Sequence, residues 1–386
     1  MKNLLSFMAA MVLMAVTGCG VRVSNMTSWS FNNLRSSTNI VQSVEIPVGV
    51  KTLDVVNAFG SLEITGSDTG PALWSQNLTV RARSDEAVQE IATNFVCRAE
   101  LDGDHLKLIV TEKDSSKPHS FQSDLEITVP KGVTVKTHNK YGPTRISELN
   151  GGVEAASQFG IMEVHDIAGK VVAETSYAAM HVNSTGPAIL RNQFGLLEAG
   201  EIHGSLDAST SYAALEAHDI GGTVKLRNQF GRLQVEKAGE ADLKTSYGEL
   251  RAKEITGDAR MVNQFGRVAA EDITGSVNAV TSYGPMNIVG RGTNFVCDNQ
   301  FGGICVEATS PALANLEAHT SYAALEVRLA SSLRPAVTAH TSYGSIESDF
   351  PVTMKSHGQD SSAMQEMGAP SINLRNQNGK IRVVSE

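Results

Sequence analysis

The sequence has few aromatic residues, no excess of positive charge and no long hydrophobic run. Aromatic side chains make up 5% of the 386 residues, whereas there are 34 glycines, which favours a narrow core of small side chains. The 41 acidic residues outnumber the 32 basic ones and leave a net charge of -9. This balance argues against nucleic acid as a partner, because such binding needs a basic face. The most apolar stretch, Leu4 to Val16, is shorter than the roughly 20 residues of a membrane-spanning helix.

Cysteine is also scarce, and the three residues beyond the N-terminal region are Cys97, Cys297 and Cys305. Their spacing resembles no zinc site, and whether any of them form a disulfide is left open by their odd number. We expect them to act as small buried hydrophobic residues. The sequence contains no Cys-x-x-Cys pair, no Gly-x-Ser-x-Gly elbow and no phosphate-binding glycine loop, so no catalytic residue, cofactor or metal ligand is predicted.

The N-terminal segment has the pattern of a bacterial lipoprotein signal peptide. Lys2 supplies a positive start, an apolar stretch follows, and residues 16–19 read Val-Thr-Gly-Cys, which resembles a lipobox. We predict a signal peptide over residues 1–18 and lipidation of Cys19, whose several acyl chains would anchor the protein to the membrane of the cell envelope. Gly20, rather than Asp, follows the cysteine and indicates the outer membrane. The Ser- and Asn-rich residues 19–39 are predicted to be a flexible tether.

Beyond this segment an aromatic residue recurs every 17 or 18 positions, and tyrosine alternates with phenylalanine. Among these recurring rings, from residue 177 onwards, each tyrosine follows Thr-Ser and each phenylalanine follows Asn-Gln. A fixed period of this length indicates stacked structural repeats. The series is Tyr141, Phe159, Tyr177, Phe194, Tyr212, Phe230, Tyr247, Phe265, Tyr283 and Phe301.

Apolar residues alternate with polar ones inside each repeat. Counting the ring as position zero, positions three, five, eight, twelve and fourteen are apolar, and a glycine turn follows position eight. This alternation predicts two short strands per repeat, each with one buried face, and stacking of the repeats into an all-β solenoid. The Asn or Thr two residues before each ring shares the parity of the buried positions, so we expect it and the ring to point inward, with amides bonding one another up a column.

The alternation leaves the size of the coil open. One repeat per coil would alternate Asn and Thr up a single column, whereas two repeats per coil would make each column uniform. Duplication of a two-repeat unit would also give the alternation, without any structural need. We favour one repeat per coil, because each repeat already contains two strands and their glycine turns. A contact of Phe194 with Phe230, rather than with Tyr212, would indicate the wider coil.

The periodic region does not cover the whole chain. Residues 40–140 are predicted to form an N-terminal cap of β-strands with one short helix, which opens at Ser84 and has an apolar stripe from Ala87 to Ala92. Residues 141–386 are the solenoid repeats. Within them, residues 351–370 are predicted to be a mobile loop, and a closing coil follows in which Asn378 takes the place of the ring.

The lipobox, the strand–helix–hairpin opening and the short-period corners together resemble the bacterial putative-adhesin β-strand-repeat family, a domain of unknown function. The chain is also similar to the head domain of putative auto-transporter adhesins. The resemblance covers roughly residues 45–386 and implies a right-handed parallel β-helix-like solenoid with an adhesive role. It supplies no catalytic residues.

A few polar residues are candidates for chemistry. His165-Asp166 and His218-Asp219 occupy the same repeat position, but three repeats separate them, about 14 Å at the strand spacing, which is too far for one metal site. His319 and His340 each precede Thr-Ser-Tyr and would be adjacent if their coils were neighbours. Finally, two arginines of the repeated Leu-Arg-Asn-Gln-Phe-Gly motif could form a sparse basic line for anionic glycans; these are Arg191 and Arg227.

Three functions remain open at this point. The first is a lipid-anchored scaffold or adhesin-like module without catalytic activity, which binds a glycan or an envelope protein by many weak contacts. The second is a polysaccharide-degrading enzyme, which requires acids or bases clustered over two or three coils beside a groove. The third is an accessory protein of an envelope signalling or stress system.

Overall fold

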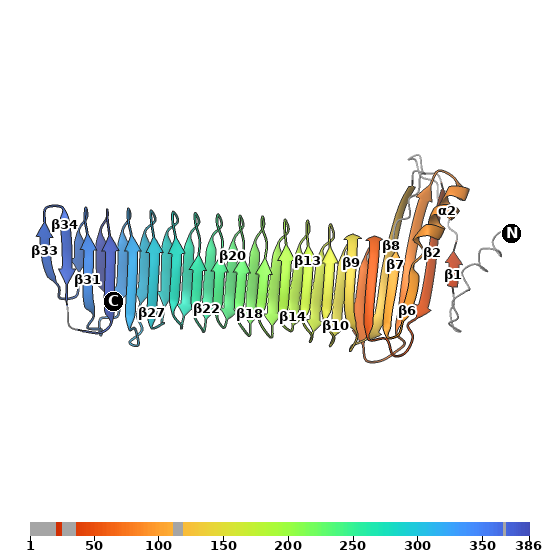
Figure 1. Ribbon diagram of the computed structural model, residues 1–386, viewed down its shortest axis with the longest axis horizontal. Coiled ribbons are helices and arrows are strands. Elements are labelled where there is room, and N and C mark those ends of the chain that lie inside the picture. Colours follow the sequence, from red (N-terminus) through yellow and green to blue (C-terminus); the bar gives the residue numbers. More distant parts are fainter. Residues whose placement is uncertain (1–20, 25–35, 111–118, 366–367) are drawn as a thin grey trace. The chain divides into compact units, whose positions relative to one another are not determined.

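The structure is a computed structural model that describes residues 36–110, 119–365 and 368–386, and residues 21–24 by their backbone. It divides the chain into two compact units, Met1–Gly152 and Val153–Glu386 (Figure 1). The predicted signal peptide, Cys19 and residues 25–35 of the predicted tether lie outside the described residues, so these assignments stay predictions.

The first unit combines antiparallel and parallel strands. β2, β5 and β8 pair antiparallel, and β4 and β10 then continue from β8 in parallel. A second set runs from the β6–β7 hairpin through β3 to β9. The elements are β1 (Val21–Ser24), β2 (Ser36–Glu45), β3 (Thr52–Phe59), β4 (Leu62–Ser67), β5 (Leu73–Ala82), α2 (Asp85–Phe95), β6 (Arg98–Asp102), β7 (His105–Val110), β8 (His119–Pro130), β9 (Thr134–Tyr141) and β10 (Thr144–Leu149).

The tether prediction is wrong for part of its range. Residues 21–24 form β1, which pairs antiparallel with β2, and residues 36–39 already belong to β2. The edge of β2 that faces away from β5 offers free backbone groups, and pairing with β1 satisfies them.

The predicted helix is confirmed as α2. The Ser84 hydroxyl caps its N-terminus by accepting a hydrogen bond from the Ala87 backbone N–H at 3.3 Å, and two acidic residues occupy the first turn. The apolar stripe is buried and packs against Leu78 and Val80 of β5. Ile91 and Phe95 are at most 1% exposed, so the helix covers one face of this sheet.

The second unit is a parallel β-solenoid, as the sequence predicts. From β11 to β28 each strand pairs with the strand two further along the chain, and the strands form the stack seen in Figure 1. Met162, for example, lies opposite Met180, and Met180 opposite Leu197. One repeat therefore closes one coil, and the preference for the narrow coil is confirmed. The even-numbered strands from β12 onwards, except β34, form one sheet, which we call the even sheet. The odd-numbered strands from β11 onwards, together with β34, form the other sheet, which we call the odd sheet.

The strands of this unit are short and evenly spaced along the chain. They are β11 (Val153–Ser157), β12 (Met162–Ile167), β13 (Val171–Thr175), β14 (Met180–Thr185), β15 (Ala188–Asn192), β16 (Leu197–Ile202), β17 (Leu206–Ser209), β18 (Leu215–Ile220), β19 (Val224–Arg227), β20 (Leu233–Ala238), β21 (Ala241–Lys244), β22 (Leu250–Ile255), β23 (Ala259–Val262), β24 (Val268–Ile273), β25 (Val277–Thr281), β26 (Met286–Gly290), β27 (Asn294–Asn299), β28 (Ile304–Ala308), β29 (Asn315–Thr320), β30 (Leu325–Leu329), β31 (Ala336–Thr341), β32 (Ile346–Ser348), β33 (Thr353–His357), β34 (Asp360–Met364), β35 (Ser371–Asn376) and β36 (Ile381–Ser385).

The core of the solenoid is made by the five predicted apolar positions of each repeat. In the coil of β16 and β17 all five side chains are at most 1% exposed. Small and branched residues alternate among them, which suits the short distance between the two sheets. The five are Leu197, Ala199, Ile202, Leu206 and Ala208.

The Asn and Thr column is buried, but its amides do not form a ladder. Asn192 donates from Nδ2 to the carbonyl oxygens of Ala178 in the preceding coil at 3.0 Å and of Gly195 in its own coil at 2.8 Å. Asn228 repeats this bond to Ala213 at 2.9 Å. The prediction of amide–amide bonds is wrong, because a Thr coil separates successive Asn coils and the backbone carbonyls of the bend lie closer.

The last coil of the chain is inserted between two earlier coils. β35 pairs with β29 on one side and β31 on the other, and β36 lies likewise between β30 and β32. Asn378 therefore belongs to an internal coil, so the prediction of a terminal coil is wrong. Arg375 lies between His319 and His340, so the two histidines are not neighbours. In the inserted position the backbone groups of β35 pair with a strand on each side, whereas a terminal position would leave those on one edge unpaired.

The predicted mobile loop over residues 351–370 contains a hairpin. β33 and β34 pair antiparallel, and β34 also pairs with β31, so this part of the prediction is wrong. The hairpin covers the edge of β31 that β35 leaves free. All five residues of β33 are exposed, and Lys355 places a charge on this edge strand, a common protection against further pairing.

The Asn column supports a stability prediction. Asn228→Ala removes the side-chain bonds to the partly buried carbonyls of Ala213 and Arg232, so we expect the free energy of unfolding to fall by about 2 kcal/mol. Urea denaturation followed by circular dichroism measures this change. Gln229→Ala, at the exposed neighbouring residue, is the control and should change stability by less than about 0.5 kcal/mol. Equal losses in both variants would contradict the role given to the amide.

Candidate binding site

The two His-Asp pairs are separate surface features. Nδ1 of His165 lies 2.9 Å from Asp166 and Nδ1 of His218 lies 3.1 Å from Asp219, each within its own dipeptide. β14 and β16 separate their strands, so they lie three coils apart as predicted. The hydrogen bond from His218, with Lys237 nearby, lowers the pKa of Asp219. Among the described residues no group of three or more His, Cys, Asp or Glu side chains is placed to hold a metal ion.

The two arginines of the predicted basic line are engaged by acids. Arg191 pairs with Asp207 at 2.9 Å, and Arg227 forms a close ion pair with Asp242. Both guanidinium groups also donate to backbone carbonyls of the coil that follows. These two arginines are therefore neutralised by acids and do not form the free basic line that the sequence suggested.

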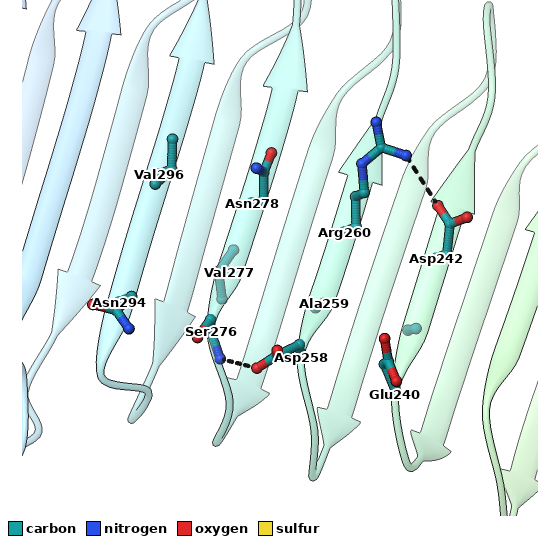
Figure 2. A pocket seen from close by; sticks show the side chains of 11 residues that line it. Glu240, Asp242, Asp258, Ala259, Arg260, Ser276, Val277, Asn278, Asn294 and Val296 are labelled. Atoms are coloured by element: carbon teal, nitrogen blue, oxygen red, sulfur yellow. Dashed lines mark hydrogen bonds and ion pairs between the residues drawn. The ribbon is translucent and has the colours of Figure 1, made fainter.

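A shallow depression of about 450 Å³ lies on the odd sheet, and its lining includes the acids Glu240, Asp242 and Asp258 (Figure 2). Two of these carboxylates have partners, since Asp242 faces Arg260 at 3.8 Å and Asp258 accepts a bond from the Ser276 backbone N–H at 2.7 Å. The side chain of Glu240 has no partner among the described residues. A second depression of about 400 Å³ further along the same sheet is lined by Lys170, Asp207 and Lys225 among others. Neither depression presents two free carboxylates facing each other.

The cysteines are unsuited to chemistry. Burial raises the pKa of Cys97 and of Cys297 to about 12, so both remain thiols at neutral pH. Cys305 lies half-buried on the even sheet, and its pKa is also raised by burial. All three are free. Cys97 and Cys297 thus behave as the small buried residues that we predicted. Cys19 lies outside the described residues.

Ten aromatic rings form one continuous stack in the second unit, from Phe159 to Tyr322. Successive ring centroids lie 4.8–5.1 Å apart, and their planes differ by only 5–11°. Phe194 stacks on Tyr212, which again identifies the narrow coil. The ring spacing matches the distance between hydrogen-bonded strands, about 4.8 Å. Each of the eight inner rings lies between two others, so its faces are covered and its edge is exposed.

The rings are exposed, so the prediction that they point inward is wrong. The phenylalanines are 40–43% exposed and the tyrosines 52–54% exposed. The physical reason is local, because β13 ends at Thr175 and β14 begins at Met180. Tyr177 lies in the bend between them, where the strict alternation of a strand no longer applies.

A glycine after each phenylalanine lets the bends approach closely. At Gly231 an added Cβ would lie 2.0 Å from the carbonyl oxygen of Ala213 in the preceding coil. Any other residue would push these coils apart at the corner and separate the rings. The Asn-Gln-Phe-Gly sequence is therefore a corner motif: a buried amide, an exposed amide, an exposed ring and a close backbone contact.

The rings and their immediate neighbours form an uncharged surface. We call it the aromatic stripe and define it as the ten rings with the residue before and after each one. Ser precedes each tyrosine, Gln precedes each phenylalanine, and Gly or Ala follows. None of these positions is charged, although charged residues make up 19% of the chain. The Ser or Gln before each ring and the Gly or Ala after it are typical of bends, so the sequence did contain a signal that the rings lie outside the strands.

The comparisons with known proteins give likeness to solved structures only. No protein-family model matches the chain, and no curated protein matches it. It is similar to a "putative cell adhesion protein" from Clostridium sporogenes, with 8% identity, a TM-score of 0.17, and 91% of this chain and 100% of that one covered. It is also similar to a "putative adhesin" from Bacteroides fragilis, with 12% identity, a TM-score of 0.25, and 68% of this chain and 97% of that one covered. A "putative lipid binding protein" from Parabacteroides distasonis has 12% identity and a TM-score of 0.19, with 89% of this chain and 96% of that one covered.

All three TM-scores are below 0.5, and all three identities are 12% or lower. Within the part of the chain that the structure describes, no helix is long and apolar enough to cross a membrane.

The raised thiol pKa values support a second prediction. In a Cys19→Ala background at pH 8, Cys97 and Cys297 should not react with a thiol reagent, because their folded-state pKa is about 12. Unfolding returns their pKa to about 8.5 and should make both react within minutes. Cys305→Ser is the control that removes the half-buried thiol. Rapid reaction of this variant without denaturant would show that the buried thiols are accessible.

Proposed function

We propose that this protein is a lipid-anchored binding module of the bacterial cell envelope that holds an extended polymer or an envelope protein and catalyses no reaction. The observation that carries the proposal is the aromatic stripe, which continues without a charged residue over ten coils. Soluble proteins rarely expose a large contiguous apolar surface, and where they do it commonly marks an interaction site.

The repeated geometry suits a long ligand. Each coil presents the same kind of ring at nearly the same spacing, so a polymer could make many equivalent contacts. Single contacts of this kind are weak, but once the first has formed the others are effectively intramolecular, and the total affinity grows. A small molecule would use only one or two coils and would gain nothing from the length of the stripe.

The proposed anchor complements this surface. The Val-Thr-Gly-Cys sequence at residues 16–19 supports lipidation of Cys19, and Gly20 supports sorting to the outer membrane. The stripe would then lie on a protein fixed to the envelope. Such an arrangement would hold a polymer close to the membrane, either within the periplasm or at the cell surface.

A polysaccharide-degrading enzyme is the weaker alternative. Cleavage by two carboxylates needs one to act as an acid and the other as a base or nucleophile. In the depression of Figure 2, the carboxylates of Asp242 and Asp258 are occupied by Arg227, Arg260 and a backbone N–H. No observation favours the third hypothesis, an accessory protein of an envelope stress system.

A capture experiment tests the proposed function. The mature chain, extracted in detergent and immobilised, should retain envelope polysaccharide, peptidoglycan or an envelope protein. The double variant Ser211→Glu and Gln229→Glu adds charge to the stripe without removing a ring, and it should lose most of this capture. Thr223→Glu with Asn278→Glu adds the same charge to exposed positions at the depressions of the odd sheet and is the matched control. Retention of none of these polymers or proteins, or equal loss in both variants, would refute the proposal.

The anchor has a test of its own. Cys19→Ala should prevent lipidation and move the protein from the membrane fraction to the soluble fraction of a Gram-negative host. Metabolic labelling with a fatty-acid analogue and cell fractionation measure both effects. Cys305→Ala is the control and should leave labelling unchanged. Membrane association of the Cys19→Ala protein would count against the lipid anchor.

A further inference from the structure

We propose that the aromatic stripe binds an uncharged, extended β-1,4-linked polysaccharide that lies along the ring stack with about one sugar per coil. This inference rests on the proposed function and names the ligand of the same surface. Three features of the stripe support it: the distance between successive rings, the alternation of Tyr and Phe over two coils, and the absence of charged residues.

The step of the stripe fits a sugar chain better than a peptide. Successive rings lie 4.8–5.1 Å apart. A pyranose in an extended β-1,4-linked chain advances by slightly more than the strand spacing of about 4.8 Å. An extended peptide along the same line advances by about 3.3 Å per residue, so about three residues span two coils and successive residues do not match successive rings. A helix advances by about 5.4 Å per turn and drifts out of step with the rings.

The two-coil alternation places a phenol on every second coil. Every contact in the stack joins a phenylalanine to a tyrosine face to face, so the tyrosine hydroxyl takes no part in it. Within the described part of the chain, the hydroxyls of Tyr177, Tyr212, Tyr247 and Tyr283 make no hydrogen bond to protein. They are therefore free to bond a ligand at every second coil.

A β-1,4-linked chain has the same alternation. Successive sugars are turned over with respect to each other, so equivalent hydroxyl groups recur at every second sugar. The stripe presents Tyr with Ser on one coil and Phe with Gln on the next. One pair of coils therefore offers one phenol, one hydroxyl and one amide to one disaccharide unit, and the pattern repeats along the stack.

The charge and the ring orientation set the remaining chemistry. Because the stripe has no charged side chain and the chain is net negative, it suits an uncharged polymer better than an acidic one. The ring faces are covered by neighbouring rings, so sugar C–H groups would contact ring edges. Orientation would come from hydrogen bonds to Tyr, Ser and Gln.

Calorimetry with the mature chain in detergent tests the inference. Cello-oligosaccharides and chito-oligosaccharides of increasing length are titrated, with α-linked oligosaccharides and peptidoglycan fragments as comparisons. The affinity for the β-1,4-linked series should rise with each added disaccharide, because each one engages a further pair of coils. The α-linked series should bind at least about tenfold more weakly, since its chain curves away from a straight stripe.

A variant keeps the test independent of folding. Changing Tyr177, Tyr212, Tyr247 and Tyr283 together to Phe preserves every ring and should lower the affinity for the longest β-1,4-linked oligomer by about tenfold or more. Tyr343→Phe is the matched control, because the coil of Asn378 separates this ring from the stack, and it should have no effect. Circular dichroism should be unchanged in both variants.

The outcomes separate this inference from the proposed function. Preference for peptidoglycan fragments, whose glycan strand is β-1,4-linked but carries charged peptides, would overturn the assignment of an uncharged ligand. Preference for α-linked glycans or for an envelope protein would overturn the β-1,4 assignment and leave the binding module intact. An unchanged affinity in the four-tyrosine variant would also overturn it. If no polymer or envelope protein binds at all, both proposals fail.

Discussion

The spacing between hydrogen-bonded parallel strands is the constraint on which the second unit depends. Backbone bonds between successive coils fix a step of about 4.8 Å, and every column of side chains must repeat at that step. The rings follow it, with centroids 4.8–5.1 Å apart, and the buried Asn side chains use it to reach a carbonyl of the preceding coil. A side chain that clashes with or repels an identical side chain at this distance would destabilise the stack of coils.

This step also explains how the surface is divided. A column of like charges would repel at each coil, so the sheet faces pair opposite charges between coils, as in Arg191 with Asp207 or Lys253 with Glu236. At the corner, repulsion between coils is avoided because the residues are uncharged, and the stacked rings attract one another. The aromatic stripe is thus a stable solution for the fold and, at the same time, an exposed surface that a ligand can use.

Part of the candidate site was accessible from the sequence. The sequence shows the period, the alternation of Tyr and Phe and the polar partners of each ring. Strand parity predicts that Tyr177 points into the core, but the strand ends at Thr175, so this parity does not reach the ring. The glycine after each phenylalanine indicates a bend in the chain. The sequence does not show why glycine is needed there; the reason is a close contact with another coil, as between Gly231 and Ala213.

The sequence alone determined the solenoid, the buried positions of each coil, the helix that begins after Ser84 and the preference for one repeat per coil, because these follow from periodicity and local capping. Only the tertiary structure decided which way the rings face, which carbonyls the Asn side chains reach and where the last coil lies. His319 and His340 illustrate the difference, since Arg375 from the end of the chain lies between them. Such contacts depend on which strand edges remain free when the coils stack, and no local pattern encodes them.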